Sequence, residues 1–583
     1  MMSKTARDAP SVNAQTDAEN FLKNEKQFHL GALPTEQSHP ATKCFSTTIA
    51  QDTTAGISLL QKVDRDIEAA LPAILRSQPW GLLHAAIQKA LVEKRKVCFS
   101  GCGATGRVSI LLEASYRRFR HEHPEANLPD SVYSIMTGGD YALVRSVESF
   151  EDYETFGRRQ VQELGITEGD VFVAVTEGGE TSSVIGSAWQ ALENGARVFF
   201  ACNNPLDVLA DCVVRSRRII EDPRITKIDL STGPMAIAGS TRLQATTMEI
   251  LVLGAALETA MAGFMGKRQH DAGEYIQQFS NLLNELAQPA QLRELATFVE
   301  LEEAVYRRHG AVTYFANRAL LDIFTDTTER APTFMLPPFR KAGDVASFRS
   351  WAFVKTPLLD TARAWERVYQ RKPRCLDWQS HDYRDMKAAQ SIINSPPAVS
   401  AAELNRFTIG CEDDPSRYQS PDDLAFLVLV GDECAGSLDH GWAKCTCKFA
   451  RAAGVAIGPA SLPEGIAGNR LHIACSLPQS ELSLWEHLAL KLVFNTVSTA
   501  TMGRMCRIAG NWMAYVETTN KKLIDRGSRL ISELAGVSYE TACRELFVTR
   551  KILTEWKLSD GEPPSPVAYT IERLKKAAGE SAS

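Results

Sequence analysis

The hydrophobic positions of this chain predict alternating strands and helices. Val97 to Phe99 is a short apolar run, and Val171 to Val175 is another, as expected of strands buried on both faces of a parallel sheet. Val132 to Met136 and Arg197 to Cys202 are two further predicted strands, and Thr53 to Leu75 carries apolar residues at helical spacing. Strands that alternate with helices pair in parallel, so the predicted fold class is α/β, a three-layer αβα sandwich.

The same pattern returns in the second half of the chain. His309 to Met335 again predicts strand, turn, helix and strand, and Ala425 to Asp432 matches the apolar run at Val171 to Val175. The chain has 583 residues, and single domains rarely exceed about 250 to 300 residues. Because the second copy lacks the glycines of the first, we predict a duplicated domain whose second copy has lost its site.

From Ser483 onward the predicted structure is almost wholly helical. The domain boundaries expected from these patterns are a mostly disordered tail at 1–44, a first domain with the ligand site at 45–280, a second domain with a degenerate site at 281–510, a helical cap at 511–575 and a tail at 576–583.

A glycine-rich turn joins the first predicted strand to its helix. Gly101, Gly103 and Gly106 lack a Cβ, so backbone N–H groups can approach an anion at the helix N-terminus, where Thr105 adds a hydroxyl. The alternative is that these glycines serve only to pack the helix on the strand. A second glycine turn, at 176–183, follows the strand at Val171 to Val175. Both turns fall at the carboxyl edge of the sheet, where ligands bind in such folds.

Composition and charge narrow the range of partners. The net charge of −6 gives no basic field for nucleic acid. The 13 cysteines are scattered singly apart from Cys445 and Cys447, which excludes zinc-site spacing and indicates reduced core residues. No signal pattern opens the chain, and the apolar stretch from Met248 to Met265 is interrupted by Glu249 and Glu258. We therefore expect a cytoplasmic protein without a membrane span, a metal or a cofactor.

Together with Gly239-Ser240-Thr241-Arg242, the two turns resemble the sugar isomerase (SIS) domain of N-acetylmuramic acid 6-phosphate etherases and of glucokinase regulatory protein. The resemblance extends to Thr35-Glu36-Gln37, Gly138-Gly139, Glu148 to Asp152, Asn495 to Ala500 and Thr519 to Leu523. The etherases have one such domain per chain, whereas glucokinase regulatory protein has two in tandem and a helical cap. The resemblance therefore implies two tandem SIS domains plus a C-terminal all-helical cap, and favours the regulatory-protein branch.

That resemblance implies a protein of carbohydrate metabolism that binds a hexose 6-phosphate or an amino-sugar phosphate, senses it and regulates a partner, with a sugar kinase as the candidate. Two tandem copies suit a monomer with an internal pseudo-dimer. The implied ligand-binding residues come from both turns, the acidic segment and the cap: Gly103, Ala104, Thr105, Gly106, Arg107, Glu151, Gly178, Gly179, Thr181, Ser182, Ser240, Lys522 and Arg526.

The alternative function is an etherase-like lyase or a sugar-phosphate isomerase with Glu151 as the catalytic base. Against it, Ser115 stands where the etherases keep a second catalytic glutamate, counted from Gly101. Glu177 and Glu180 replace neutral residues of the family, so either they point to solvent or the ligand is less charged than the family's.

Three implied site residues have simpler explanations. The alternative for Glu151 is a solvated residue in the first turn of a helix, and the alternative for Arg107 is an ion-pair partner. Lys522 reads as part of a solvated basic face, which is the usual place for charges on a helix.

Overall fold

The first half of the chain folds around a five-stranded parallel sheet. The computed structural model describes residues 12–147, 149–433, 436, 438–466, 468–556 and 562–579. The sheet has the order β2-β1-β3-β4-β5. Its strands are β1 (Val97–Gly101), β2 (Val132–Met136), β3 (Val171–Val175), β4 (Arg197–Cys202) and β5 (Thr226–Asp229).

A second parallel sheet repeats this topology. Its strands are β6 (Val312–Phe315), β7 (Ala352–Lys355), β8 (Leu424–Val430), β9 (Arg451–Ile457) and β10 (Arg470–Ile473). Their order is β7-β6-β8-β9-β10, so β6 takes the place of β1, and β8 the place of β3. The α/β class and the two parallel sheets predicted from the sequence are confirmed.

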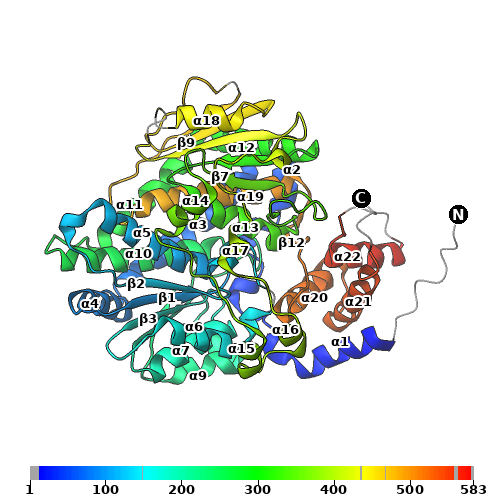
Figure 1. The fold of residues 1–583 in the computed structure, drawn as a ribbon. Helices are drawn as coiled ribbons and strands as arrows, with labels where there is room; N and C mark the ends of the chain where they lie inside the picture. Colours follow the sequence, from blue (N-terminus) through cyan, green and yellow to red (C-terminus); the bar gives the residue numbers. More distant parts are fainter. Residues whose placement is uncertain are drawn as a thin grey trace.

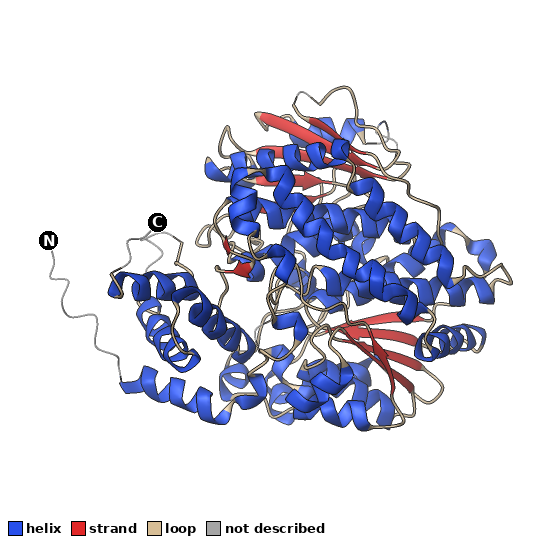
Figure 2. Ribbon diagram, turned by 180° about the vertical axis from the view of Figure 1, so that it is seen from behind, coloured by secondary structure: helices blue, strands red, loops and turns tan. Residues whose placement is uncertain are grey.

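Helices cover both sheets and fill the space between them. In chain order they are α1 (Val12–Asn24), α2 (Phe45–Gln51), α3 (Thr53–Leu75), α4 (Gln78–Val92), α5 (Ala104–Glu122), α6 (Glu154–Leu164), α7 (Ser182–Glu193), α8 (Leu206–Cys212), α9 (Val214–Glu221), α10 (Gln244–Phe264), α11 (Ala272–Leu286), α12 (Pro289–Arg307), α13 (Leu320–Phe334), α14 (Thr361–Tyr369), α15 (Ser380–Asp385), α16 (Gln390–Asn394), α17 (Ala401–Leu404), α18 (Asp439–Thr446), α19 (Leu484–Arg504), α20 (Lys521–Ala535), α21 (Tyr539–Leu553) and α22 (Pro566–Ala577). Figure 2 shows the helical layer between the two sheets.

The helix α10 lies in the centre of the molecule. Every residue from Gln244 to Ala262 is buried, because the helix is apolar on all sides and packs against α3, α4, α5 and α19. It is long and apolar enough to cross a membrane, but 89% of its most apolar window is buried inside the protein. The composition of α10 is therefore that of a core helix joining the two halves.

The helices α20 to α22 form the cap, a separate lobe beside the body, with α1 packed along it (Figure 1). A two-stranded ribbon of β11 (Ile508–Ala509) and β12 (Trp512–Met513) precedes the cap and pairs with Ala238 of the first domain. The cap therefore begins next to the carboxyl edge of the first sheet.

The expectation of a disordered tail at 1–44 is wrong from residue 12 onward. The helix α1 buries Phe21 against the cap, and Leu30 and Leu33 are buried against the first domain. These apolar residues are too widely spaced to form a periodic pattern, so their burial depends on distant parts of the chain. Residues 1–11 lie outside the described residues, and the other domain boundaries stay a prediction.

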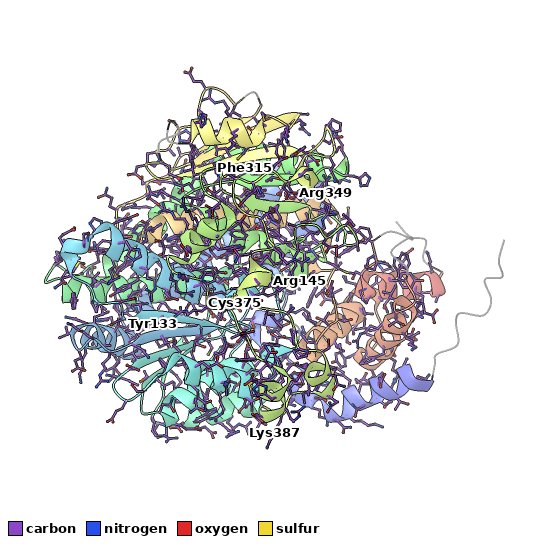
Figure 3. All side chains as sticks on the ribbon, viewed as in Figure 1. Tyr133, Arg145, Phe315, Arg349, Cys375 and Lys387 are labelled. Atoms are coloured by element: carbon purple, nitrogen blue, oxygen red, sulfur yellow. The ribbon has the colours of Figure 1, made fainter. Side chains whose placement is uncertain are left out.

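The segment from Arg371 to the end of α16, which the predicted boundaries assign to the second domain, packs on the first domain. Arg371 binds Glu113 of α5 at 3.0 Å, and the Arg374 guanidinium lies over the Tyr133 ring, 5.5 Å from its centre. Figure 3 shows Cys375 between the two sheets and Lys387 at the lower edge of the first domain. This segment, which carries α15 and α16, fastens the two domains together.

Candidate functional site

A cavity of about 250 Å³ lies where the first sheet, the second domain and the cap meet. Its walls come from six separate parts of the chain: the first turn (Cys102, Gly103, Ala104), the segment around Glu151, the second turn (Glu177, Thr181), the loop Gly239 to Arg242, α13 (Glu329, Pro332, Thr333), and the cap (Thr519, Asn520, Lys522, Leu523, Arg526). Its volume suits a ligand smaller than a typical drug molecule.

The N-termini of three helices converge on this cavity. Gly103, Thr181 and Asn520 are the N-cap residues of α5, α7 and α20, and all three line the cavity. No side chain caps α5 or α7, whereas Asn520 accepts a hydrogen bond from the Leu523 N–H at 2.9 Å. The first N–H groups of α5 and α7 therefore point toward the cavity without a side-chain acceptor, which is the arrangement that binds anions.

The glycines of the first turn have two different roles. A Cβ on Gly101 would lie 2.4 Å from the carbonyl carbon of Thr105, and one on Gly106 would lie 2.7 Å from the Met136 side chain. These two glycines let α5 pack closely on the sheet. Gly103 instead has φ +57° and nothing within 4 Å of its Cβ position, so it opens the turn toward the cavity. Gly101 and Gly106 thus serve to pack the helix on the strand, whereas Gly103 fits the alternative in which the turn is open to an anion.

Thr105 and Arg107, both predicted to bind ligand, lie behind the cavity. The Thr105 hydroxyl accepts from the Cys102 N–H at 2.9 Å and donates to the Cys102 carbonyl at 2.8 Å, which fixes the turn. Arg107 is 1% exposed and forms an ion pair with Glu329 of α13. The ion-pair alternative for Arg107 is therefore the one observed, and Arg107 joins the first turn to the second domain.

The two glutamates of the second turn do not point to solvent. Glu180 is 3% exposed, and its carboxylate lies 2.6 Å from the Lys522 ammonium. Burial raises the pKa of Glu180, but Lys522 and Arg215 outweigh it, so the net shift is downward. Glu177 lines the cavity and accepts from the Thr246 hydroxyl at 2.9 Å, and burial together with Glu329 raises its pKa.

The cap contributes two cations to the wall of the cavity. Lys522 pairs with Glu180, and Arg526 binds both carboxylate oxygens of Glu36, at 2.9 and 2.6 Å. The pair with Glu36 brings the N-terminal segment and the cap together at the cavity. Lys521 points elsewhere and pairs with Glu25 at 2.7 Å. Lys522 is thus no part of a solvated basic face, since its side chain is 25% exposed and paired.

Glu151 lies opposite the cap. Its carboxylate accepts from the Asn520 side-chain amide at 2.6 Å, and burial raises its pKa to about 6 although Lys522 opposes the shift. It is partly covered by the cap and lines the cavity, so the solvated alternative does not describe it. Glu148, quoted with it from the sequence, lies outside the described residues.

Ser115 does not face this cavity. Its hydroxyl lies 3.0 Å from Nε2 of His487, whose Nδ1 lies 2.8 Å from Asp322, beside a separate cavity at the start of α13. Ser115 sits inside α5, where its own N–H belongs to the helix, so the backbone oxyanion hole of a serine hydrolase is missing at this position. The three side chains form a buried polar contact between the two domains.

A glutamate of the second domain, Glu329, lines the main cavity, which Ser115 does not. Ser115 follows Gly101, the last residue of β1, by the same 14 positions that separate Glu329 from Phe315, the last residue of β6 (101 to 115, 315 to 329). Glu329 lines the main cavity together with Glu151. Counting in the second copy as well as in the first would have found it.

The predicted site residues therefore form two groups. Seven line the cavity: Gly103, Ala104, Glu151, Thr181, Ser240, Lys522 and Arg526. The other six, Thr105, Gly106, Arg107, Gly178, Gly179 and Ser182, are outside this lining and belong to the turns behind it. Glu36, Glu329 and Asn520 were missing from the prediction as site residues, because their roles depend on contacts between distant segments.

Tandem parallel α/β domains, with uncapped helix N-termini under a helical cap, define a two-domain protein of the sugar isomerase (SIS) class. Residues 82–191 match the family model of the glucokinase regulatory protein N-terminal SIS domain. The chain is 31% identical over 238 residues to an N-acetylmuramic acid 6-phosphate etherase of Deinococcus radiodurans, covering 40% of this chain and 69% of that one. This chain belongs to the family of SIS-domain proteins that includes these etherases and glucokinase regulatory protein.

Two further similarities have lower sequence identity. An N-acetylmuramic acid 6-phosphate etherase of Bacillus licheniformis is 27% identical over 240 residues, covering 41% of this chain and 71% of that one. The solved C-terminal domain of glucosamine-fructose-6-phosphate aminotransferase from Francisella tularensis has a TM-score of 0.42 at 12% identity, covering 76% of this chain and 94% of that chain. The second likeness is too low to carry an argument. More than half of this chain lies outside both etherase alignments.

Proposed function

We propose that this protein binds a hexose 6-phosphate in the cavity between its domains and acts as a sensor of the glucokinase regulatory protein type. The observation that carries the proposal is the convergence of the uncapped N-termini of α5 and α7 with Lys522 on one cavity. Helix N-termini and a lysine together offer N–H donors and positive potential to a phosphate. Glu151, Asn520 and Glu329 offer acceptors and donors for sugar hydroxyls.

The same cavity gives a ligand the means to act on a partner. The first domain supplies the two turns, the second domain supplies Glu329, and the cap supplies Lys522 and Arg526. A ligand that contacts all three parts favours one of their arrangements over others by its difference in affinity. A protein partner that binds the favoured arrangement, for which a sugar kinase is the candidate, then senses the ligand. The pairing of both domains within one chain supports a monomer with an internal pseudo-dimer, and we place the protein in the cytoplasm.

Thermal unfolding tests the binding step. A hexose 6-phosphate at ~100 times its dissociation constant is expected to stabilise the protein by ~2.7 kcal/mol, and the unphosphorylated sugar is expected to give no shift. No shift with fructose, glucose, glucosamine or N-acetylmuramic acid 6-phosphate overturns the proposal.

A matched pair of glycine variants locates the binding site. Gly103→Ala strains the first turn, since Gly103 has φ +57°, and is expected to remove the thermal shift. Gly536→Ala is the control, because Gly536 has φ +65° and open space but ends α20 away from the cavity. Equal ligand shifts in the two variants contradict binding at this turn.

An etherase-like lyase is the second candidate, favoured by the presence of Glu151 and Glu329 in one cavity. Two carboxyl groups there supply a base for the sugar proton and an acid for the departing lactate oxygen. Ser115 supplies no acid, and Glu329 offers the second carboxyl group in its place. Incubation with N-acetylmuramic acid 6-phosphate separates the two functions. A lyase releases lactate and loses this activity in Glu329→Gln, whereas a sensor binds the sugar without releasing lactate.

A further inference from the structure

Each cation in the wall of the cavity already has a carboxylate partner outside it. Lys522 pairs with Glu180 at 2.6 Å and Arg526 pairs with Glu36 at 2.6 Å. Arg242 pairs with Asp326 at 3.0 Å. The protein's own carboxylates therefore balance the three positive charges that face the cavity. The positive potential inside the cavity is much weaker than three cationic side chains alone would give.

Two of the three carboxylates in the wall have only neutral partners. Glu329 is paired with Arg107. Within the part of the chain that the structure describes, Glu151 is held by the Asn520 amide at 2.6 Å and Glu177 by the Thr246 hydroxyl at 2.9 Å, and neither forms an ion pair. Both are partly buried, and this burial raises the pKa of each. The charges left without a partner in this cavity are negative.

This imbalance separates three classes of sugar phosphate. A phosphate of an uncharged hexose brings more negative charge into the cavity and leaves both carboxylates unpaired. A phosphate of an N-acetylated amino sugar does the same. A hexosamine phosphate with a free amine carries an ammonium group, which pairs with a carboxylate inside a cavity that screens it little. Its phosphate is still received by the uncapped N-termini of α5 and α7.

We infer that the preferred ligand of this cavity is an aminohexose phosphate with a free ammonium group, held at its phosphate by the two helix N-termini and at its nitrogen by Glu177 and Glu151. The inference rests on the proposed binding of a sugar phosphate in this cavity and specifies its chemical class. It also accounts for the two glutamates of the second turn: Glu180 balances Lys522, and Glu177 meets the ammonium group.

Calorimetric titration of the full chain at pH 7.5 tests the inference with three probes: glucosamine 6-phosphate, glucose 6-phosphate and N-acetylglucosamine 6-phosphate. Glucosamine 6-phosphate is expected to bind at least ~10-fold more tightly than the other two, as one charge-assisted contact gives. In Glu177→Gln the preference is expected to fall several-fold, while glucose 6-phosphate binds as well as before or better. Glu533→Gln, on the exposed side of α20, is the control and keeps the wild-type preference.

The outcomes distinguish this inference from the function on which it rests. Equal affinity for the three probes overturns the inference and leaves sugar-phosphate binding intact. No binding of any probe overturns both. A preference for glucosamine 6-phosphate that survives in both Glu177→Gln and Glu151→Gln overturns the assignment to these carboxylates, and circular dichroism of each variant checks that it is folded.

Discussion

The two halves of this protein use the same strand-turn-helix unit in opposite ways. After β1 the chain turns through Gly103 and enters α5 beside an open cavity. After β6 it turns through Asn317 and Arg318 and enters α13, whose N-terminus also lacks a side-chain cap. In this second unit the Glu433 carboxylate accepts from the N–H groups of Arg318 and Val430, each at 3.1 Å.

Glu433 lies three positions after β8, and Glu177 lies two positions after β3. The second copy therefore has a carboxylate of its own beside the start of α13. The Arg318 side chain binds a second internal carboxylate beside the same turn, because it donates to both oxygens of Glu486 at 3.0 Å. The two units therefore share a fold but differ at their turns. The second unit has an internal carboxylate that accepts from backbone N–H groups, whereas the first turn borders a cavity.

Lys522→Met removes a cation from the site of the first unit and is expected to have the largest effect on ligand affinity and stability. Sugar-phosphate affinity is expected to fall ~10- to 100-fold, because a charge-assisted contact is lost. The free energy of unfolding falls by up to ~3 kcal/mol, since Glu180 keeps a buried charge without a partner. Urea unfolding and calorimetric titration measure the two effects.

A second variant separates these two effects of Lys522. Lys522→Met with Glu180→Gln is expected to regain stability but not affinity. Lys521→Met, which removes the pair with Glu25 and a contact with the Phe28 ring outside the cavity, is expected to change neither strongly. Equal loss of affinity from Lys521→Met and Lys522→Met contradicts a specific role for Lys522.

Glu433→Ala tests whether the Glu433 carboxylate occupies an anion-binding position in the second unit. Removing the carboxylate leaves the N–H groups of Arg318 and Val430 without their acceptor, so the variant is expected to lose ~1 to 3 kcal/mol of stability. Inorganic phosphate is expected to restore part of this loss, measured by thermal unfolding in a Gly103→Ala background that disables the first site. If phosphate stabilises the double variant no more than Gly103→Ala alone, the Glu433 carboxylate does not occupy an anion-binding position.

The smallest expected effect concerns the pH dependence of stability that Glu151 gives the first unit. The pKa of Glu151 rises from 4.5 to about 6 on folding, so between these values the folded protein holds a proton that the unfolded chain releases. The contribution to stability is present below pH 4.5 and lost as pH rises through 6, by up to ~2 kcal/mol. Urea unfolding from pH 4.5 to 7.5 should show this loss in the wild type and not in Glu151→Gln. Parallel pH profiles for the two proteins contradict the shift.

Much of the site could be predicted because it depends on local patterns. The helix Thr53–Leu75 and the strands β2, β3 and β4 have the boundaries that periodicity predicts. Gly103 and Thr181 lie where strands end and helices begin, so their place at the edge of the sheet follows from chain order and parallel pairing. The resemblance of Thr519 to Leu523 to the family made Lys522 a predicted ligand-binding residue, and Lys522 lines the cavity.

What the tertiary structure alone decided is how charged residues far apart in the chain are paired. Arg526 and Glu36 are separated by 490 positions, and Lys522 and Glu180 by 342. By sequence, Ser115 stands where the etherases keep a second catalytic glutamate, but its side chain on α5 contacts His487 of the second domain, and Glu329 lines the cavity instead. Local periodicity fixes strands, helices and turns, because these depend on neighbouring residues. The charge balance of the cavity depends on which distant side chains burial brings together, and no local pattern encodes that.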